Sequence, residues 1–255
     1  MMKKFCVSIL FLFIFGLNSS LASEVVGTII NNNALPSTIT GSITNVTVNS
    51  VTLSLDTPSV SISANSSGIF NLNIPANISN PILDLGSLVF ANHATLPATV
   101  ITTGSVGGVV MALNIPSGTT ITAATTTWDG HIMLPRISNT FIAPQPATGN
   151  SLTVTSAIEM GSPLFRINFS NAVRITFGGL ANNYIGYMNN GTFVPIVTSC
   201  AVDSQAWADS NSNIVPGGEC YMLQGSNLIL WTKHFTTFGT YTQQPVVVPS
   251  SGGGG

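Results

Sequence analysis

The residues of this chain that could carry out chemistry are few and widely separated. Its three histidines, His93, His131 and His234, lie far apart in the sequence. Asp129-Gly130-His131 places a carboxylate beside an imidazole, but Asp and Gly in this order are typical of a tight turn between strands. The sequence also lacks the signatures of a nucleophile elbow, a zinc-binding helix, a phosphate loop and a dinucleotide-binding fold. We therefore predict a turn at this tripeptide and no enzyme activity.

One segment begins like a calcium-binding loop but does not continue as one. Asp209–Asn213 (DSNSN) has the acidic and amide residues with which such a loop starts. Ile214 then stands where the loop needs glycine, and Cys220 stands where it needs a bidentate glutamate, with Glu219 one position early. We expect a solvated loop here, no metal site and no cofactor.

The N-terminus has the layout of a secretory signal peptide. Met1–Lys4 is positively charged, Phe5–Leu17 is apolar, and Ser20–Ala22 places small residues before a cleavage point at Ser23. We predict that residues 1–22 are a signal peptide and that the mature protein is secreted or displayed on the cell surface. The alternative is an uncleaved anchor, although the apolar run is short for a membrane span. Membrane attachment is expected only through this signal or through an anchor outside this sequence.

Cys200 and Cys220 are candidates for a disulfide bond. Cys6 lies in the predicted signal peptide, so the two cysteines that remain have one pairing available. The alternative is a metal site, which needs two more ligands, and the nearby His234 has no second histidine at metal-binding spacing. We predict a disulfide, because exported proteins form and keep such bonds.

Composition excludes several classes of function. Charged residues make up 5% of the chain, against about a quarter in ordinary soluble domains. Without residues 1–22, eight acidic residues face four basic ones, which are Arg136, Arg166, Arg174 and Lys233. Nucleic-acid binding needs clustered Lys and Arg, and disorder needs low hydrophobicity, whereas 44% of this chain is hydrophobic. We expect neither property.

The mature chain is predicted to be almost entirely β-strand. Thr44–Leu55, Val60–Ser63 and Ile69–Ile74 alternate apolar residues with Ser, Thr and Asn, and clusters of Gly, Pro and Asn separate such segments. The pattern predicts an all-β fold of antiparallel β-sandwich modules with Greek-key-like connections. Further strands are predicted at Leu85–Phe90, Gly108–Ile115, Ser151–Glu159, Leu164–Phe169, Ala172–Phe177, Tyr184–Met188, Phe193–Val197, Tyr221–Leu223, Asn227–Trp231 and Thr236–Tyr241.

A soft boundary at Pro75–Pro81 (PANISNP) divides the chain. It separates an N-terminal β-strand module, residues 23–75, from a C-terminal β-sandwich module, residues 82–242. Residues 243–255 are rich in Pro, Ser and Gly, a composition typical of a linker.

Four segments of the second module resemble strands of one known family. They are Asn114–Thr119 (NIPSGT), Phe169–Ile175 (FSNAVRI), Tyr187–Ile196 (YMNNGTFVPI) and Thr232–Phe238 (TKHFTTF). The segments resemble the β-sandwich domain shared by ankyrins, netrin receptors and zonula-occludens proteins, with Ala172 where that family commonly has proline. Residues 108–242 also resemble repeated extracellular modules of uncharacterised bacterial cell-surface proteins. The resemblance implies a β-sandwich with a surface role.

The resemblance also draws attention to His234-Phe235-Thr236. In related domains of adhesion receptors, a His–hydrophobic–Ser/Thr tripeptide cuts its own backbone. His234 would be the base, Thr236 the nucleophile and the Phe235 carbonyl the target. The reaction also needs a strained peptide and an oxyanion donor, and many members of the sandwich family stay uncut. We expect no catalytic residue here and keep self-cleavage at Phe235–Thr236 as an alternative.

The closing strand poses a packing problem. Phe235 and Phe238 cannot both point inward in a regular strand, because side chains alternate between its faces. A bulge or a turn of the chain near Thr236-Thr237 would bury both; otherwise Phe238 lies on the opposite face. We expect this segment to form a sealing edge of the module.

Together these features predict a secreted or cell-surface structural or adhesion module without catalytic activity. Its expected partners are other cell-surface or envelope components and not nucleic acid. The remaining alternative is a carbohydrate- or calcium-binding surface module. An exposed row of Trp or Tyr on one sheet would favour sugar binding, but we expect Trp128, Trp207 and Trp231 in the core or in hairpins.

Overall fold

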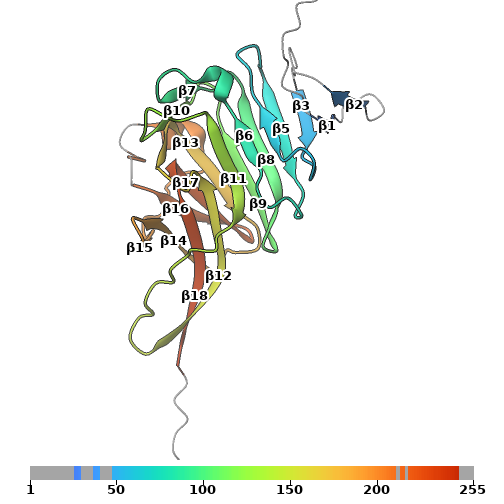
Figure 1. Cartoon of the computed structure of the whole chain (residues 1–255). Coiled ribbons are helices and arrows are strands. Elements are labelled where there is room, and N and C mark those ends of the chain that lie inside the picture. The colour runs from blue at the N-terminus through green and yellow to red at the C-terminus, as the bar shows by residue number, and fades with distance from the viewer. Residues whose placement is uncertain (1–25, 30–36, 41–47, 211–212, 216–217, 247–255) are drawn as a thin grey trace, which may run out of the picture.

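The computed structural model describes residues 26–29, 37–40, 48–210, 213–215 and 218–246. The predicted signal peptide lies outside the described residues, as does most of the predicted linker. Two β-sheets pack against each other (Figure 1), which confirms the predicted all-β sandwich.

Within the described ranges, the larger sheet contains eleven strands and the smaller sheet seven. In spatial order, the larger sheet contains β16 (Cys220–Gln224), β17 (Asn227–Phe235), β13 (Ile167–Phe177), β9 (Val109–Ile115), β8 (Thr99–Val106), β5 (Ile69–Ile74), β3 (Val48–Thr52), β1 (Val26–Ile29) and β2 (Ser37–Thr40). Its remaining strands are β10 (Thr120–Ala123), which pairs with β13, and β7 (His93–Thr95), which pairs with β10. The smaller sheet contains β15 (Thr192–Pro195), β14 (Tyr184–Asn189), β18 (Thr237–Pro245), β12 (Asn150–Gly161), β11 (His131–Ile137), β6 (Ile82–Asp84) and β4 (Ser59–Ser61). The helical elements are the 3-10 turn η1 (Gly86–Leu88) and the short helix α1 (Gln205–Asp209).

The sheets are mixed, which differs from the purely antiparallel pairing expected from the sequence. Along the chain, β3 and β5 belong to the larger sheet while β4 and β6 belong to the smaller one. Because the chain crosses to the other sheet between them, each returning strand runs parallel to the previous strand of its sheet. Parallel pairs therefore form between β3 and β5, β4 and β6, and β5 and β8. Strand alternation is the same in both directions, so the sequence pattern does not distinguish the two.

Strands on both sides of the predicted boundary at residues 75–81 share one sheet. Ile69–Ile74 pairs with Thr99–Gly104 along its whole length. Buried residues of the first segment, such as Leu53 and Phe70, belong to the same hydrophobic cluster as Leu113 of the second. The division into two modules stays a prediction about separate folding.

Several local predictions need correction. Residues 85–90 contain the 3-10 turn η1 where we expected a strand, and β6, β7, β8, β10 and β11 form where none was expected. β13 is one strand where we expected two, at Leu164–Phe169 and Ala172–Phe177. β18 continues to Pro245, so Gln243 to Pro245 pair with β12 and are not linker. Figure 1 shows this end of β12 and β18 projecting beyond the body of the sandwich.

The closing segment is a corner between the two sheets. β17 ends at Phe235 in the larger sheet, and β18 begins at Thr237 in the smaller one. Because the chain changes sheet at Thr236, Phe235 and Phe238 are both buried, at 2% and 0% exposure. Of the arrangements that the spacing left open, the turn of the chain is the one that forms. The expected edge position is wrong, since β17 lies between β16 and β13, and β18 lies between β14 and β12.

Candidate functional site

His234 is buried beside a carboxylate. Its ring Nδ1 lies 2.6 Å from Oε1 of Glu219, and both side chains are almost fully buried. The Thr232 hydroxyl lies 3.2 Å from the same Nδ1, accepts from the His234 N–H at 3.1 Å and donates to the His234 carbonyl at 3.0 Å. The ring meets Tyr187 edge-on, with centroids 5.0 Å apart. The Thr232 hydroxyl and the Tyr187 ring therefore contact an imidazole that lies beside a buried carboxylate.

The contact between Glu219 and His234 is close but not an aligned hydrogen bond. Oε1 of Glu219 is buried and has no hydrogen-bond partner of good geometry among the described residues. The two buried polar groups are therefore in close contact without an aligned hydrogen bond between them.

Thr236 uses its hydroxyl to hold the backbone of β14. Its Oγ1 donates a hydrogen bond to the Met188 carbonyl at 2.7 Å. No hydrogen bond among the described residues joins this hydroxyl to the His234 ring, although self-cleavage would require His234 to accept its proton. His234, Phe235 and Thr236 do line one cleft of about 240 Å³, together with Arg166.

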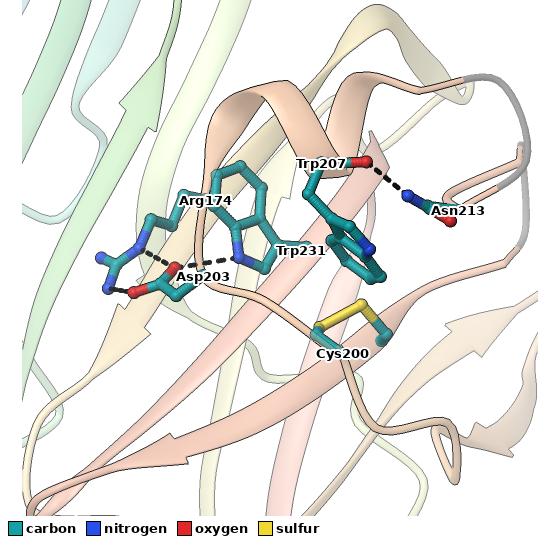
Figure 2. Close-up of a disulfide and its surroundings, with 7 residues drawn as sticks. Arg174, Cys200, Asp203, Trp207, Asn213 and Trp231 are labelled. Carbon is teal, nitrogen blue, oxygen red and sulfur yellow. Dashed lines mark hydrogen bonds and ion pairs between the residues drawn. A yellow bond between two sulfur atoms is a disulfide. The ribbon is translucent and has the colours of Figure 1, made fainter.

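The predicted disulfide between Cys200 and Cys220 is present, with Cα atoms 5.1 Å apart. The loop that it closes contains α1 and packs against the outer face of the larger sheet at β13 and β17 (Figure 2). A second hydrophobic cluster forms beneath this loop, outside the main core. Its buried members are Ala172, Cys200, Ala208, Ile214, Cys220, Ile229 and Trp231. Figure 2 shows the Trp207 indole next to the disulfide.

A charged pair secures the start of the disulfide loop. Nε and one terminal nitrogen of Arg174 donate to the two carboxylate oxygens of Asp203, each at 2.8 Å. Trp231 Nε1 donates to the same carboxylate at 3.1 Å. The hydrogen bonds from Arg174, with its positive charge and the Trp231 hydrogen bond, hold the pKa of Asp203 below its ordinary value although burial opposes this.

The candidate calcium residue Asp209 binds backbone instead. β13 has an irregular register between Asn168 and Val173, and Oδ1 of Asp209 accepts the Ala172 N–H within that stretch at 2.6 Å. Gln205 donates to the Ala172 carbonyl at 2.8 Å. Residues 211–212 of the predicted loop lie outside the described residues. Asp209 therefore helps to dock α1 on the sheet.

The tripeptide Asp129-Gly130-His131, which the sequence singled out, forms a turn at the surface. Asp129 Oδ1 accepts the His131 N–H at 3.0 Å, and Gly130 has a φ of 90°. In the part of the chain that the structure describes, no three His, Cys, Asp or Glu side chains gather as metal ligands would. Within the same ranges, none of the helices has the length and apolar character of a membrane-spanning helix.

Sequence reasoning missed two residues of these sites, Glu219 beside His234 and Asp203 beside Arg174. A signal existed for the first. Gly225-Ser226 joins β16 to β17 with Gln224 opposite Asn227, and Cys220 then falls opposite Trp231. Counting one step further along this hairpin brings Glu219 near the end of β17.

Comparison of the chain with family models, with curated proteins and with solved structures found no match. The structure shows an all-β sandwich in which a loop closed by one disulfide covers an outer face. What the protein does must therefore be argued from its own side chains.

Proposed function

We propose that the chain is exported and acts at the cell surface as a structural or adhesion module without catalytic activity. The observation that carries the proposal is the disulfide loop. The Cys200–Cys220 bond closes a loop over a buried apolar cluster that includes Trp231. Such bonds persist in oxidising compartments, which supports export.

The use of the scarce charged side chains supports a structural role. Arg136 lies 3.3 Å from Glu159 and Arg174 lies 2.8 Å from Asp203. The buried His234 faces Glu219. These groups interact with one another and hold strands or loops in place.

Surface display is tested on intact cells of the organism that encodes the chain. An antibody raised against residues 23–255 should bind intact cells as strongly as permeabilised ones, while an antibody against a cytosolic protein should bind only after permeabilisation. Binding that appears only after permeabilisation would contradict the proposal.

Self-cleavage at Phe235–Thr236 is the second candidate, favoured by the imidazole of His234 held beside Glu219 at 2.6 Å. Against it stands the Thr236 hydroxyl, which donates to the Met188 carbonyl. We propose that the bond stays intact. Mass spectrometry of the denatured protein should show one chain for both wild type and Thr236→Ala. Two fragments in wild type, absent in Thr236→Ala and retained in Thr236→Ser, would establish self-cleavage.

A further inference from the structure

The outer face of the smaller sheet carries a cluster of aromatic rings over β14, β15 and β18. Tyr184 stacks on Tyr241 with ring centroids 5.5 Å apart and planes inclined by 28°. Phe193 meets Tyr241 edge-on at 5.6 Å, and Phe141 meets Phe193 edge-on at 5.7 Å. Because side chains alternate along a strand, Tyr184 faces away from the core that the buried Ile185 enters.

Two glycines make room for this cluster. Gly186 of β14 and Gly239 of β18 lie directly opposite each other. A Cβ at Gly186 would overlap the Phe193 ring, and one at Gly239 would overlap the Phe141 ring. Neither glycine has a positive φ, so close approach of the rings is what requires them. The aromatic surface is thus built into the strands.

A cleft of about 420 Å³ lies beside Tyr184. Two tyrosines and four side-chain amides dominate its lining: Tyr184, Tyr221, Asn182, Asn183, Gln243 and Gln244. Among the described residues, no charged side chain lines it. Tyr184 is 53% exposed as a residue, and Asn183 is oriented by the Thr155 hydroxyl, which donates to its Oδ1 at 2.5 Å.

We propose that this cleft binds a neutral glycan. The exposed face of Tyr184 offers an aromatic surface on which the C–H face of a sugar ring can stack. Carboxamides both donate and accept hydrogen bonds, which matches the hydroxyl groups around such a ring. An uncharged lining gives an acidic or basic ligand no counter-charge. The inference rests on the proposed function, because a surface module meets glycans outside the cell.

Calorimetric titration of the purified mature chain tests the site. The probes are four uncharged hexasaccharides, built from β-1,4-linked glucose, α-1,4-linked glucose, mannose and galactose. We expect at least one to bind with a Kd below about 1 mM, and Tyr184→Ala to weaken it by about tenfold or more. Tyr184→Phe keeps the ring and should change the Kd by less than about threefold.

The matched control is Phe90→Ala. Phe90 is an aromatic residue with 76% exposure, and it does not line this cleft. Its removal should leave the Kd unchanged. No binding of any of the four probes, or equal weakening by Phe90→Ala and Tyr184→Ala, would overturn the site. Sialylated and sulfated hexasaccharides are titrated in parallel, and tighter binding of these than of the four neutral probes would overturn the neutral ligand class. A chain found on intact cells that binds no probe refutes only the site, whereas a chain found only inside cells refutes the proposed function.

Discussion

Both sheets carry aromatic side chains on their outer faces, but the chain covers these faces differently. On the larger sheet, the disulfide loop lies over Trp231 and leaves it 2% exposed. On the smaller sheet, Tyr184 keeps 53% exposure and borders a cleft. The first face forms a second hydrophobic cluster, while the second presents aromatic and amide groups to solvent.

The difference shows how a chain with few charges divides its aromatic residues between stability and binding. Covering Trp231 requires a cross-linked loop, the short helix α1 and the Arg174–Asp203 pair. On the smaller sheet, Gly186 and Gly239 instead leave room for aromatic rings to pack close to the strands. Tyr184 is not covered by a described loop. A ring that is buried stabilises the fold, whereas a ring left open beside carboxamides is suited to contact a ligand.

The largest effect is expected from Trp231→Ala. The substitution removes a buried indole and its hydrogen bond to Asp203. Loss of such a side chain should lower the free energy of unfolding by about 3–5 kcal/mol. Urea unfolding followed by far-UV circular dichroism measures this. A loss below about 1 kcal/mol would mean that the covered face does not stabilise the fold.

Removing the disulfide should have the next largest effect. The Cys200→Ala, Cys220→Ala double variant frees a loop whose ends are 20 residues apart in the sequence. The loop-closure entropy corresponds to about 3 kcal/mol of unfolding free energy. Near-UV circular dichroism should show that the environment of the tryptophans changes, while far-UV circular dichroism should show that the sheet signal is retained. Wild type in reductant is the control and should behave like the double variant.

Asp203→Asn should reduce stability by about 1–2 kcal/mol at neutral pH, because a charge-assisted pair with Arg174 is lost. The folded pKa of Asp203 is lowered, so its contribution is fully present above the unfolded pKa, near 3.8, and is lost as the pH falls through the folded pKa. Unfolding curves at several pH values should therefore show wild type and variant converging below about pH 4. A constant difference down to pH 2 would contradict the role of this carboxylate.

Tyr184→Ala should have the smallest effect on stability. Tyr184 is more than half exposed, and its main described ring contact is the stack on Tyr241. The unfolding free energy should fall by less than about 1 kcal/mol. Urea unfolding of Tyr184→Ala and Trp231→Ala in parallel gives the comparison directly. If both variants lost the same free energy of unfolding, the distinction between the two faces would be removed.

The sequence pattern predicted several strands but missed others, such as β8 (Thr99–Val106), and it did not predict how the strands pair. Alternation in Ile69–Ile74 marks a half-buried strand, and β5 occupies these residues. The same alternation fits parallel and antiparallel neighbours, so the parallel pairing with β8 was not foreseeable. Residues 85–90 have apolar residues but form a 3-10 turn, in which Leu88 N–H bonds to the Leu85 carbonyl.

The candidate sites were less predictable than the strands, because their geometry depends on which sheet each strand joins. The single pairing available to Cys200 and Cys220 predicted the disulfide. The burial of both Phe235 and Phe238 required a change of sheet at Thr236, which the odd spacing only offered as one solution. The cluster around Tyr184 depends on Phe141, which lies far along the chain from β14.

Peptide mapping of the protein recovered from the surface of its native cells tests the account most directly. Digested under denaturing conditions without reductant, the protein should yield a peptide that begins at Ser23, two peptides joined by the Cys200–Cys220 bond and a peptide that spans Phe235–Thr236. Finding all three would match export, disulfide formation and an intact Phe235–Thr236 bond together. A cell-associated chain that retains residues 1–22 and carries free thiols at Cys200 and Cys220 would contradict the account.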